Sequence, residues 1–195
     1  MSSHESDFRT DLMTTLLKLF PRGRFLDLAC GHGTVSILAK NLGWDVTGVD
    51  VRTKRMPGVE GIRWIESDVR QFQIPPHEYD LIACLGLLYH LELKDQLDLL
   101  ARCATMPTIV DTHVSLAPTH EELGYRGELF DELGGRTLEQ HKASGTASWG
   151  NIVSFWADEE SLLRMFADSG FHATFKLTPG YMKDRTFYLC LPQGA

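Results

Sequence analysis

The sequence predicts an α/β fold with a doubly wound, mostly parallel sheet of seven strands, and three observations lead to this prediction. Short apolar runs alternate with segments of helical spacing along most of the chain, which favours a parallel sheet with helices on both faces. A glycine-rich turn joins the first apolar run to a helical segment, as at the ligand-binding edge of such sheets. The last two apolar runs lie close together, which predicts a C-terminal hairpin with an antiparallel edge strand.

The first half of the chain is predicted to begin with a helix and then to alternate between strands and helices. Apolar residues from Phe8 to Leu19 recur at spacings of three and four, which predicts an N-terminal helix within residues 1–20, over 5–19. The segment between the second and third predicted strands is unusually short for a crossover. We expect strands at 24–29, 45–50 and 62–67, a helix at 34–42, and a turn or short helix at 68–72.

The second half continues the alternation but contains a long interruption. Residues 116–157 are polar, glycine-rich and aromatic without clean periodicity. A connection of this length is too long for an ordinary loop, so we expect an insert that covers a substrate. Around it we expect strands at 79–86, 108–115, 171–177 and 185–191, helices at 91–103 and 158–168, and a turn at Pro179 and Gly180.

Composition and charge narrow the class of protein. With 195 residues and 43% hydrophobic content, the chain fits one domain over 1–195 with its own core. The net charge of −7 has the wrong sign for wide contact with phosphates, so a nucleic-acid partner is disfavoured. The four cysteines are far apart, and the start carries acidic residues and no apolar signal. We expect a cytoplasmic protein without a membrane partner, as a monomer or homodimer.

The turn after the first strand has the properties of a ligand cradle. Gly31 and Gly33 let a ligand lie against bare backbone where a helix begins. Asp50 ends the second strand, about where a carboxylate must stand to accept both ribose hydroxyls of a bound nucleoside. The glycines and the acid together favour a nucleoside-containing cofactor.

These residues carry a resemblance to a known family. The run DLACGHG followed by GVD resembles the first two motifs of class I S-adenosylmethionine-dependent methyltransferases, and the likeness in strand order extends over nearly the whole chain. It implies S-adenosyl-L-methionine as cofactor, S-adenosyl-L-homocysteine as product, a methionine part beside the glycine loop, and a ribose on Asp50. The cofactor-binding residues that it implies are Asp27, Ala29, Gly31, Gly33, Asp50, Val51, Ser67, Asp68, Val69, Leu85 and Gly86.

Two other interpretations of the glycine loop remain. A nicotinamide dinucleotide enzyme favours glycine or alanine at the last position of its G-x-G-x-x-G pattern, where this chain has Ser36. A nicotinamide cofactor also gives no reason for an acidic residue after the third strand. A glycine-rich turn without a ligand is the other alternative.

Two histidines are candidates for the catalytic base. His90 lies in the run GLLYHL after the fourth strand, and His113 lies on the fifth strand two residues after Asp111, so both side chains of that pair leave the same face. Asp111 could orient His113, or the two could contribute ligands to a metal, although we expect no metal in this site. The alternative is that His113 is a packed strand residue.

The acceptor is less defined than the cofactor. Tyr89, Tyr125, Trp149 and Trp156 are candidates for contact with it, although packing would explain the insert's aromatic residues equally well. We expect a biosynthetic methyltransferase acting on a small molecule, with O-methylation of a sugar or natural-product intermediate preferred. GLLYHL is also similar to the corresponding segment of transfer-RNA wobble-uridine modifying methyltransferases. A cofactor-binding scaffold or regulator without catalysis is the third alternative.

Overall fold

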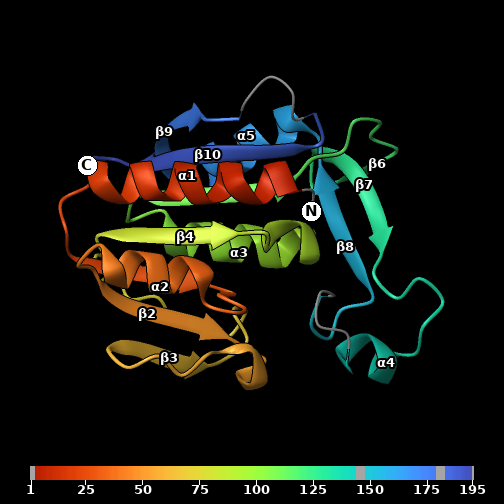
Figure 1. The fold of residues 1–195 in the computed structure, drawn as a ribbon. Helices are drawn as coiled ribbons and strands as arrows, with labels where there is room; N and C mark the ends of the chain where they lie inside the picture. The colour runs from red at the N-terminus through yellow and green to blue at the C-terminus, as the bar shows by residue number, and fades with distance from the viewer. Residues whose placement is uncertain (1–2, 144–147, 179–182, 195) are drawn as a thin grey trace. The chain divides into compact units, whose positions relative to one another are not determined.

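The computed structural model describes residues 3–143, 148–178 and 183–194, so the turn expected at Pro179 and Gly180 lies outside the described residues. Seven strands form one sheet in the order β3-β2-β1-β4-β5-β10-β9, which confirms the predicted fold class (Figure 1). The chain divides into two compact units, residues 1–83 and 84–195. Strand β4 (Leu81–Leu85) crosses from the first unit into the second.

In the first unit, three parallel strands follow an N-terminal helix, as predicted. Helix α1 covers Ser3–Leu19 and helix α2 covers Thr34–Asn41. Asp27 on β1 pairs with Gly48 on β2, and Asp50 on β2 pairs with Glu66 on β3. The short link between β2 and β3 contains only a single 3-10 turn. The bounds are β1 Arg24–Leu28, β2 Asp45–Asp50, the turn η1 Thr53–Arg55, and β3 Ile62–Glu66.

The core of the first unit holds the strands against the helices. Phe25 on β1 is fully buried and meets the ring of Trp44 edge-on at 6.0 Å. The indole nitrogen of Trp44 donates to the carbonyl of Leu17 at 3.1 Å, which connects the end of α2 to α1. These contacts pack the starts of β1 and β2 against α1.

In the second unit, β10 runs antiparallel to both β5 and β9, so the antiparallel strand lies between two others and β9 forms the edge. Asp158 begins helix α5 by accepting a hydrogen bond from the amide of Ser161 at 2.8 Å. The elements are the turn η2 Leu88–His90, α3 Leu93–Cys103, β5 Thr108–His113, α5 Glu159–Asp168, β9 Phe171–Lys176 and β10 Arg185–Pro192.

The insert has more regular structure than its sequence indicated. A three-stranded antiparallel sheet is formed by β6 (His120–Glu122), β7 (Tyr125–Asp131) and β8 (Val153–Ala157) (Figure 1). A short helix, α4, covers Leu138–Ala143. Most side chains of β7 are exposed, so its sequence lacks the alternation of apolar and polar residues that marks a half-buried strand.

Among the residues described, none of the helices is both long enough and apolar enough to cross a membrane.

Candidate active site

The glycine loop after β1 has a backbone that few residue types tolerate. Gly31 has a φ of 54° and Gly33 a φ of 69°, both in the left-handed region. A Cβ at Gly33 would lie 2.6 Å from Cη2 of Trp64 and 3.1 Å from Cδ of Pro57. The amide of Gly33 donates to the carbonyl of Cys30 at 2.8 Å, which closes the turn before α2. The loop is therefore a tight cradle of bare backbone within the first unit.

Asp50 supports this cradle from the end of β2. Its side chain is only 4% exposed, and its Oδ2 accepts a hydrogen bond from the amide of Gly31 at 2.9 Å. Its Oδ1 accepts from the amide of Arg52 at 2.7 Å. Each carboxylate oxygen has two lone pairs, so these bonds leave one acceptor position on each oxygen. A fixed carboxylate with two remaining acceptor positions suits the neighbouring hydroxyls of a ribose.

Asp27 is a buried residue of β1 and lies four positions before Gly31 in the chain. The hydroxyl of Ser36 donates to its Oδ2 at 2.6 Å. Burial raises the pKa of the Asp27 carboxyl to about 6, against the lowering effects of the Ser36 hydrogen bonds and the positive charge of Arg9. Ser36, which breaks the dinucleotide pattern, thus has a defined role as a donor to Asp27. A cation bound beside Asp27 would stabilise the carboxylate.

Asp68 follows β3 and has an ion partner in its own turn. Its Oδ1 accepts from the backbone amide and from Nε of Arg70, each at 3.0 Å. Burial acts to raise the pKa of Asp68, but the hydrogen bonds and charge of Arg70 outweigh it, and the pKa lies below its usual value. The carboxylate is therefore ionised, and an adenine amino group would share it with Arg70. The neighbouring Ser67 donates its amide to the carbonyl of Asp50 at 3.2 Å, and Val69 is buried.

The other residues of the implied cofactor set have simple structural roles. Ala29 has a φ of 53°, so it adopts the left-handed conformation of Gly31 and Gly33 although it carries a side chain. Val51 directly follows Asp50, and Leu85 ends β4. In the second unit, Gly86 has a φ of 73° and donates its amide to the carbonyl of Asp111 at 2.8 Å.

Four of the predicted catalytic and acceptor residues lie together in the second unit. The ring of Tyr89 lies 4.2 Å from that of His90 and meets His113 edge-on at 4.7 Å, measured between centroids. His113 is stacked on Trp156 at 5.0 Å. Residues from η2, β5, β7 and β8 are thus brought into one group, which we call the aromatic cluster: Tyr89, His90, His113, Phe130 and Trp156.

Phe130, one of the aromatic residues of the insert, joins this cluster from β7. Its ring is stacked on Trp156 at 4.8 Å with an angle of 16° between the planes, and the residue is 42% exposed. Trp156 therefore already has two protein rings stacked on it, from Phe130 and His113. Phe130 has more accessible ring surface for a planar or apolar acceptor.

The expected partnership of Asp111 with His113 is replaced by two others. Asp111 is fully buried and accepts both Nε and Nη2 of Arg185, at 2.7 and 2.8 Å. The Nδ1 of His113 lies 3.1 Å from the carbonyl oxygen of Asp184. A carbonyl only accepts, so Nδ1 carries the hydrogen and Nε2 carries a lone pair. Burial, and then the charge of Arg185, lower the pKa of His113.

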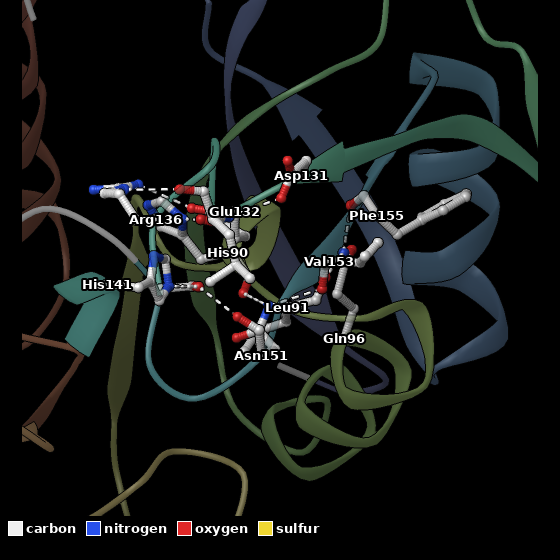
Figure 2. Close-up of polar contacts among 12 residues, drawn as sticks. His90, Leu91, Gln96, Asp131, Glu132, Arg136, His141, Asn151, Val153 and Phe155 are labelled. Atoms are coloured by element: carbon white, nitrogen blue, oxygen red, sulfur yellow. Dashed lines mark hydrogen bonds and ion pairs between the residues drawn. The ribbon is translucent and has the colours of Figure 1, made fainter. Parts of the chain in front are cut away.

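His90 has a carboxylate as its partner. Its Nδ1 lies 3.0 Å from Oε1 of Glu132, a buried residue that follows β7 (Figure 2). Sequence reasoning missed Glu132 because it lies 42 positions from His90, in a segment without periodicity. The pairing of β7 with β8 and the hydrogen bonds of Asn151 and Phe155 to His90 and Leu91, none of which a local pattern reveals, bring the two together.

Two predicted acceptor residues lie in other surroundings. Tyr125 is 7% exposed, its hydroxyl donates to Oδ2 of Asp168 at 2.7 Å, and the guanidinium of Arg164 covers its ring. These contacts pack Tyr125 between β7 and α5, and its contact with an acceptor stays a prediction. Trp149 has the Nζ of Lys142 5.5 Å above its ring, and its exposure is intermediate.

Within the described parts of the chain, no group of three or more His, Cys, Asp or Glu side chains is arranged to hold a metal ion.

Comparison with known proteins relates part of this chain to methyltransferases. Residues 25–107 match a family model described as a methyltransferase domain. The chain is 30% identical over 140 residues to a ubiquinone biosynthesis O-methyltransferase of Burkholderia orbicola, an alignment covering 67% of this chain. It spans only 58% of that relative's length. A putative methyltransferase of Bacillus subtilis, YqeM, is 29% identical over 82 residues, which are 38% of this chain and 33% of YqeM.

Solved structures show the same fold at low sequence identity. The N-terminal domain of EvdMO1 with S-adenosylhomocysteine bound superposes with a TM-score of 0.74 at 19% identity, covering 93% of this chain and 79% of that domain. The glycopeptide N-methyltransferase MtfA, complexed with S-adenosylmethionine, has a TM-score of 0.62 at 15% identity, covering 95% of this chain and 87% of MtfA. Residues 25–107 are thus similar to a methyltransferase domain, and the chain has the Rossmann-like fold of S-adenosylmethionine-dependent methyltransferases.

Proposed function

We propose that this chain transfers the methyl group of S-adenosylmethionine to an oxygen atom of a small-molecule acceptor. The observation that carries the proposal is the hydrogen bond from Gly31 to Asp50, which fixes a carboxylate beside the glycine loop. Both residues lie inside the segment that matches the methyltransferase domain model. The activity, the acceptor and the reacting oxygen are parts of this proposal.

The residues of the first unit fit the chemical groups of the cofactor. Asp50 has free acceptor positions for the two ribose hydroxyls, and Asp27 is a buried carboxylate suited to the ammonium group of the methionine part. Asp68 would share a carboxylate oxygen with the adenine amino group. When bound, the cofactor supplies an electrophilic methyl group on a sulfonium. The protein then needs only to align an acceptor with that methyl group and, for a hydroxyl, to remove a proton.

The second unit supplies residues for these acceptor tasks. His90 and His113 each have Nδ1 engaged by an oxygen acceptor, so Nε2 is available to take a proton. Phe130 offers exposed ring surface against which an acceptor can pack. A basic nitrogen next to aromatic rings favours a hydroxyl on a compact organic molecule, and we prefer a sugar or another natural-product intermediate.

The printed names of similar proteins support this acceptor class. One relative is a ubiquinone biosynthesis O-methyltransferase, and the N-terminal domain of EvdMO1 was crystallised in the presence of S-adenosylhomocysteine and D-fucose. A third, from Burkholderia thailandensis, is a 1,6-didemethyltoxoflavin-N1-methyltransferase. All three descriptions mention a small molecule, and two of them name an O-methyltransferase and an N1-methyltransferase.

The test is transfer of a labelled methyl group. The protein is incubated with S-adenosylmethionine tritiated on the methyl carbon and a cell extract separated into RNA, protein and small metabolites. We expect label in the small metabolites as an ether that is stable to alkali, and none with the Asp50→Ala variant. Label in RNA would support the transfer-RNA alternative instead, and label in no fraction would support a scaffold.

A further inference from the structure

The Glu132–His90 pair is a buried carboxylate facing a partly exposed imidazole. The side chain of Glu132 is 4% exposed and that of His90 is 23% exposed. Their contact joins Oε1 of Glu132 to Nδ1 of His90 at 3.0 Å (Figure 2). A carboxylate only accepts hydrogen bonds, so this geometry places a hydrogen on Nδ1 and leaves the lone pair on Nε2.

Glu132 is held in its ionised form. Burial acts to raise its pKa, but the hydrogen bond and charge of His90, together with the backbone amide of Ser148, lower it below the usual value for a glutamate. The partner of His90 at neutral pH is therefore a negative carboxylate rather than a neutral acid, which would offer a competing donor.

The backbone around both residues is fixed by the insert. The amide of Glu132 donates to the carbonyl of Ile152 at 3.0 Å, and Nη2 of Arg136 donates to the carbonyl of Glu132 at 2.9 Å. On the other side, Nδ2 of Asn151 donates to the carbonyl of His90 at 2.9 Å (Figure 2). Because Asn151 and Ile152 are neighbours, one short segment before β8 positions both members of the pair.

We infer that Glu132 is a positioning residue for methyl transfer, holding His90 in the tautomer whose Nε2 takes the proton of the acceptor hydroxyl. This inference rests on the proposed function. The hydroxyl oxygen forms the new C–O bond while the C–S bond of the sulfonium breaks, and the electron pair of that bond stays on sulfur. The hydroxyl proton passes to Nε2, and the resulting imidazolium stays hydrogen-bonded through Nδ1 to the Glu132 carboxylate.

The partners of the two histidines favour His90 over His113 as the base. Protonated His90 would face a carboxylate, which stabilises the positive charge. Protonated His113 would face the carbonyl of Asp184 at 3.1 Å and, farther away at 3.8 Å, the carboxylate of Asp184, but burial and the charge of the Arg185 guanidinium outweigh this carboxylate and lower the pKa of His113. His113 thus remains a neutral ring that packs on Trp156.

The first test determines the tautomer of His90 and needs no measurement of enzymatic activity. The protein is labelled with ¹⁵N in its histidines, and long-range proton–nitrogen correlation spectra are recorded at pH 8, with His90→Gln used to assign the ring. We expect Nδ1 protonated and Nε2 unprotonated in the wild type. A ring protonated on Nε2 would overturn the inference, and this result needs no variant of Glu132 to fold.

The second test changes Glu132 and measures kinetics, with the acceptor identified in the labelling experiment. Glu132→Gln retains the shape but removes the charge, and its amide nitrogen cannot accept from the neighbouring donors. We expect kcat to fall on the order of 10²-fold with KM for the cofactor within about threefold, and the Nδ1–H signal of His90 to diminish. Glu139→Gln, an exposed glutamate of α4, is the matched control and should leave kcat and the His90 signals unchanged.

The two levels of the proposal fail in different ways. Absence of cofactor binding by the wild type in calorimetry would overturn the proposed function itself. Normal cofactor binding and turnover, with an unchanged kcat in Glu132→Gln, would overturn the role of Glu132 alone. If Glu132→Gln lowers kcat and cofactor affinity equally and leaves the His90 tautomer intact, Glu132 has only a structural role and the inference is wrong.

Discussion

The Oδ2 atom of Asp50 lies 2.9 Å from the amide nitrogen of Gly31, so the end of β2 and the glycine loop after β1 are joined by a charge-assisted hydrogen bond. Asp50 also accepts from the amide of Arg52. The backbone therefore orients the carboxylate before any ligand binds. Binding then costs little conformational entropy of the Asp50 side chain.

The first prediction concerns Asp50 and cofactor affinity. Asp50→Ala removes the acceptor for the ribose hydroxyls and the support of Gly31, so calorimetry should show S-adenosylhomocysteine binding at least about 30-fold more weakly, since a hydrogen bond to a charged group contributes roughly 1.5–3 kcal/mol. Asp45→Ala, at the exposed start of the same strand, is the control and should bind like the wild type. Equal affinity of both variants would remove Asp50 from the cofactor site.

The second prediction separates backbone strain from steric clash in the glycine loop. Gly33 and Gly58 both have a positive φ, but a Cβ at Gly33 would meet Trp64 whereas a Cβ at Gly58 has no atom within 4 Å. Gly58→Ala should cost about 1 kcal/mol of unfolding free energy, from strain alone. Gly33→Ala should cost about 2 kcal/mol more, because the side chain of Trp64 must move. Similar costs in urea unfolding would show that the cradle is less tight than the structure indicates.

The third prediction concerns pH and Asp27. Burial raises the pKa of Asp27 to about 6, so below that pH the ligand-free protein carries a neutral carboxyl group there. A cationic cofactor group prefers the carboxylate, so affinity should increase as pH rises towards 6, by up to about tenfold per pH unit, and level off above it. Asp27→Asn should bind more weakly at pH 7.5 and lose most of this dependence. An equally steep dependence in Asp27→Asn would assign the titration to another group.

The fourth prediction concerns the buried pair of Asp111 and Arg185. Arg185→Met leaves a carboxylate buried without its bidentate partner and should cost about 3–5 kcal/mol of unfolding free energy. Replacing both, as Asp111→Leu with Arg185→Met, should recover most of that loss. Thermal and urea unfolding of the two variants measure the difference, and a double variant no more stable than the single one would contradict it.

The fifth prediction concerns the packing of Tyr125. Tyr125→Phe removes the hydrogen bond to Asp168, so it should lower the unfolding free energy by about 1 kcal/mol. Because the residue packs between β7 and α5, kcat and KM for the acceptor should stay within about twofold of the wild type. A large rise in KM without loss of stability would place Tyr125 at the acceptor site.

Much of the fold could be predicted because its signals are local. The helix over 5–19 and the strand over 45–50 follow from hydrophobic spacing, and the ligand cradle follows from glycines and an acid at the ends of two strands. These patterns depend on neighbouring residues only. The mostly parallel sheet of seven strands follows because alternation of strands and helices leaves few other arrangements.

The acceptor side could be predicted only in part. Tyr89, His90, His113 and Trp156 were chosen from their positions after strands or in the insert, and the structure places them together. Glu132 could not be found, because its importance depends on a contact with a residue far away in the chain. The spacing of Asp111 and His113 left several roles open for the pair, and it could not show that Asp111 forms its ion pair with the buried Arg185, which lies far away in the chain.

The most direct test of the account is a crystal structure of the protein with S-adenosylhomocysteine. The account predicts both ribose hydroxyls within hydrogen-bond distance of the Asp50 carboxylate, and the amino acid part of the ligand against Gly31 and Gly33. Density for the ligand at any other place, with the glycine loop bare, would contradict it.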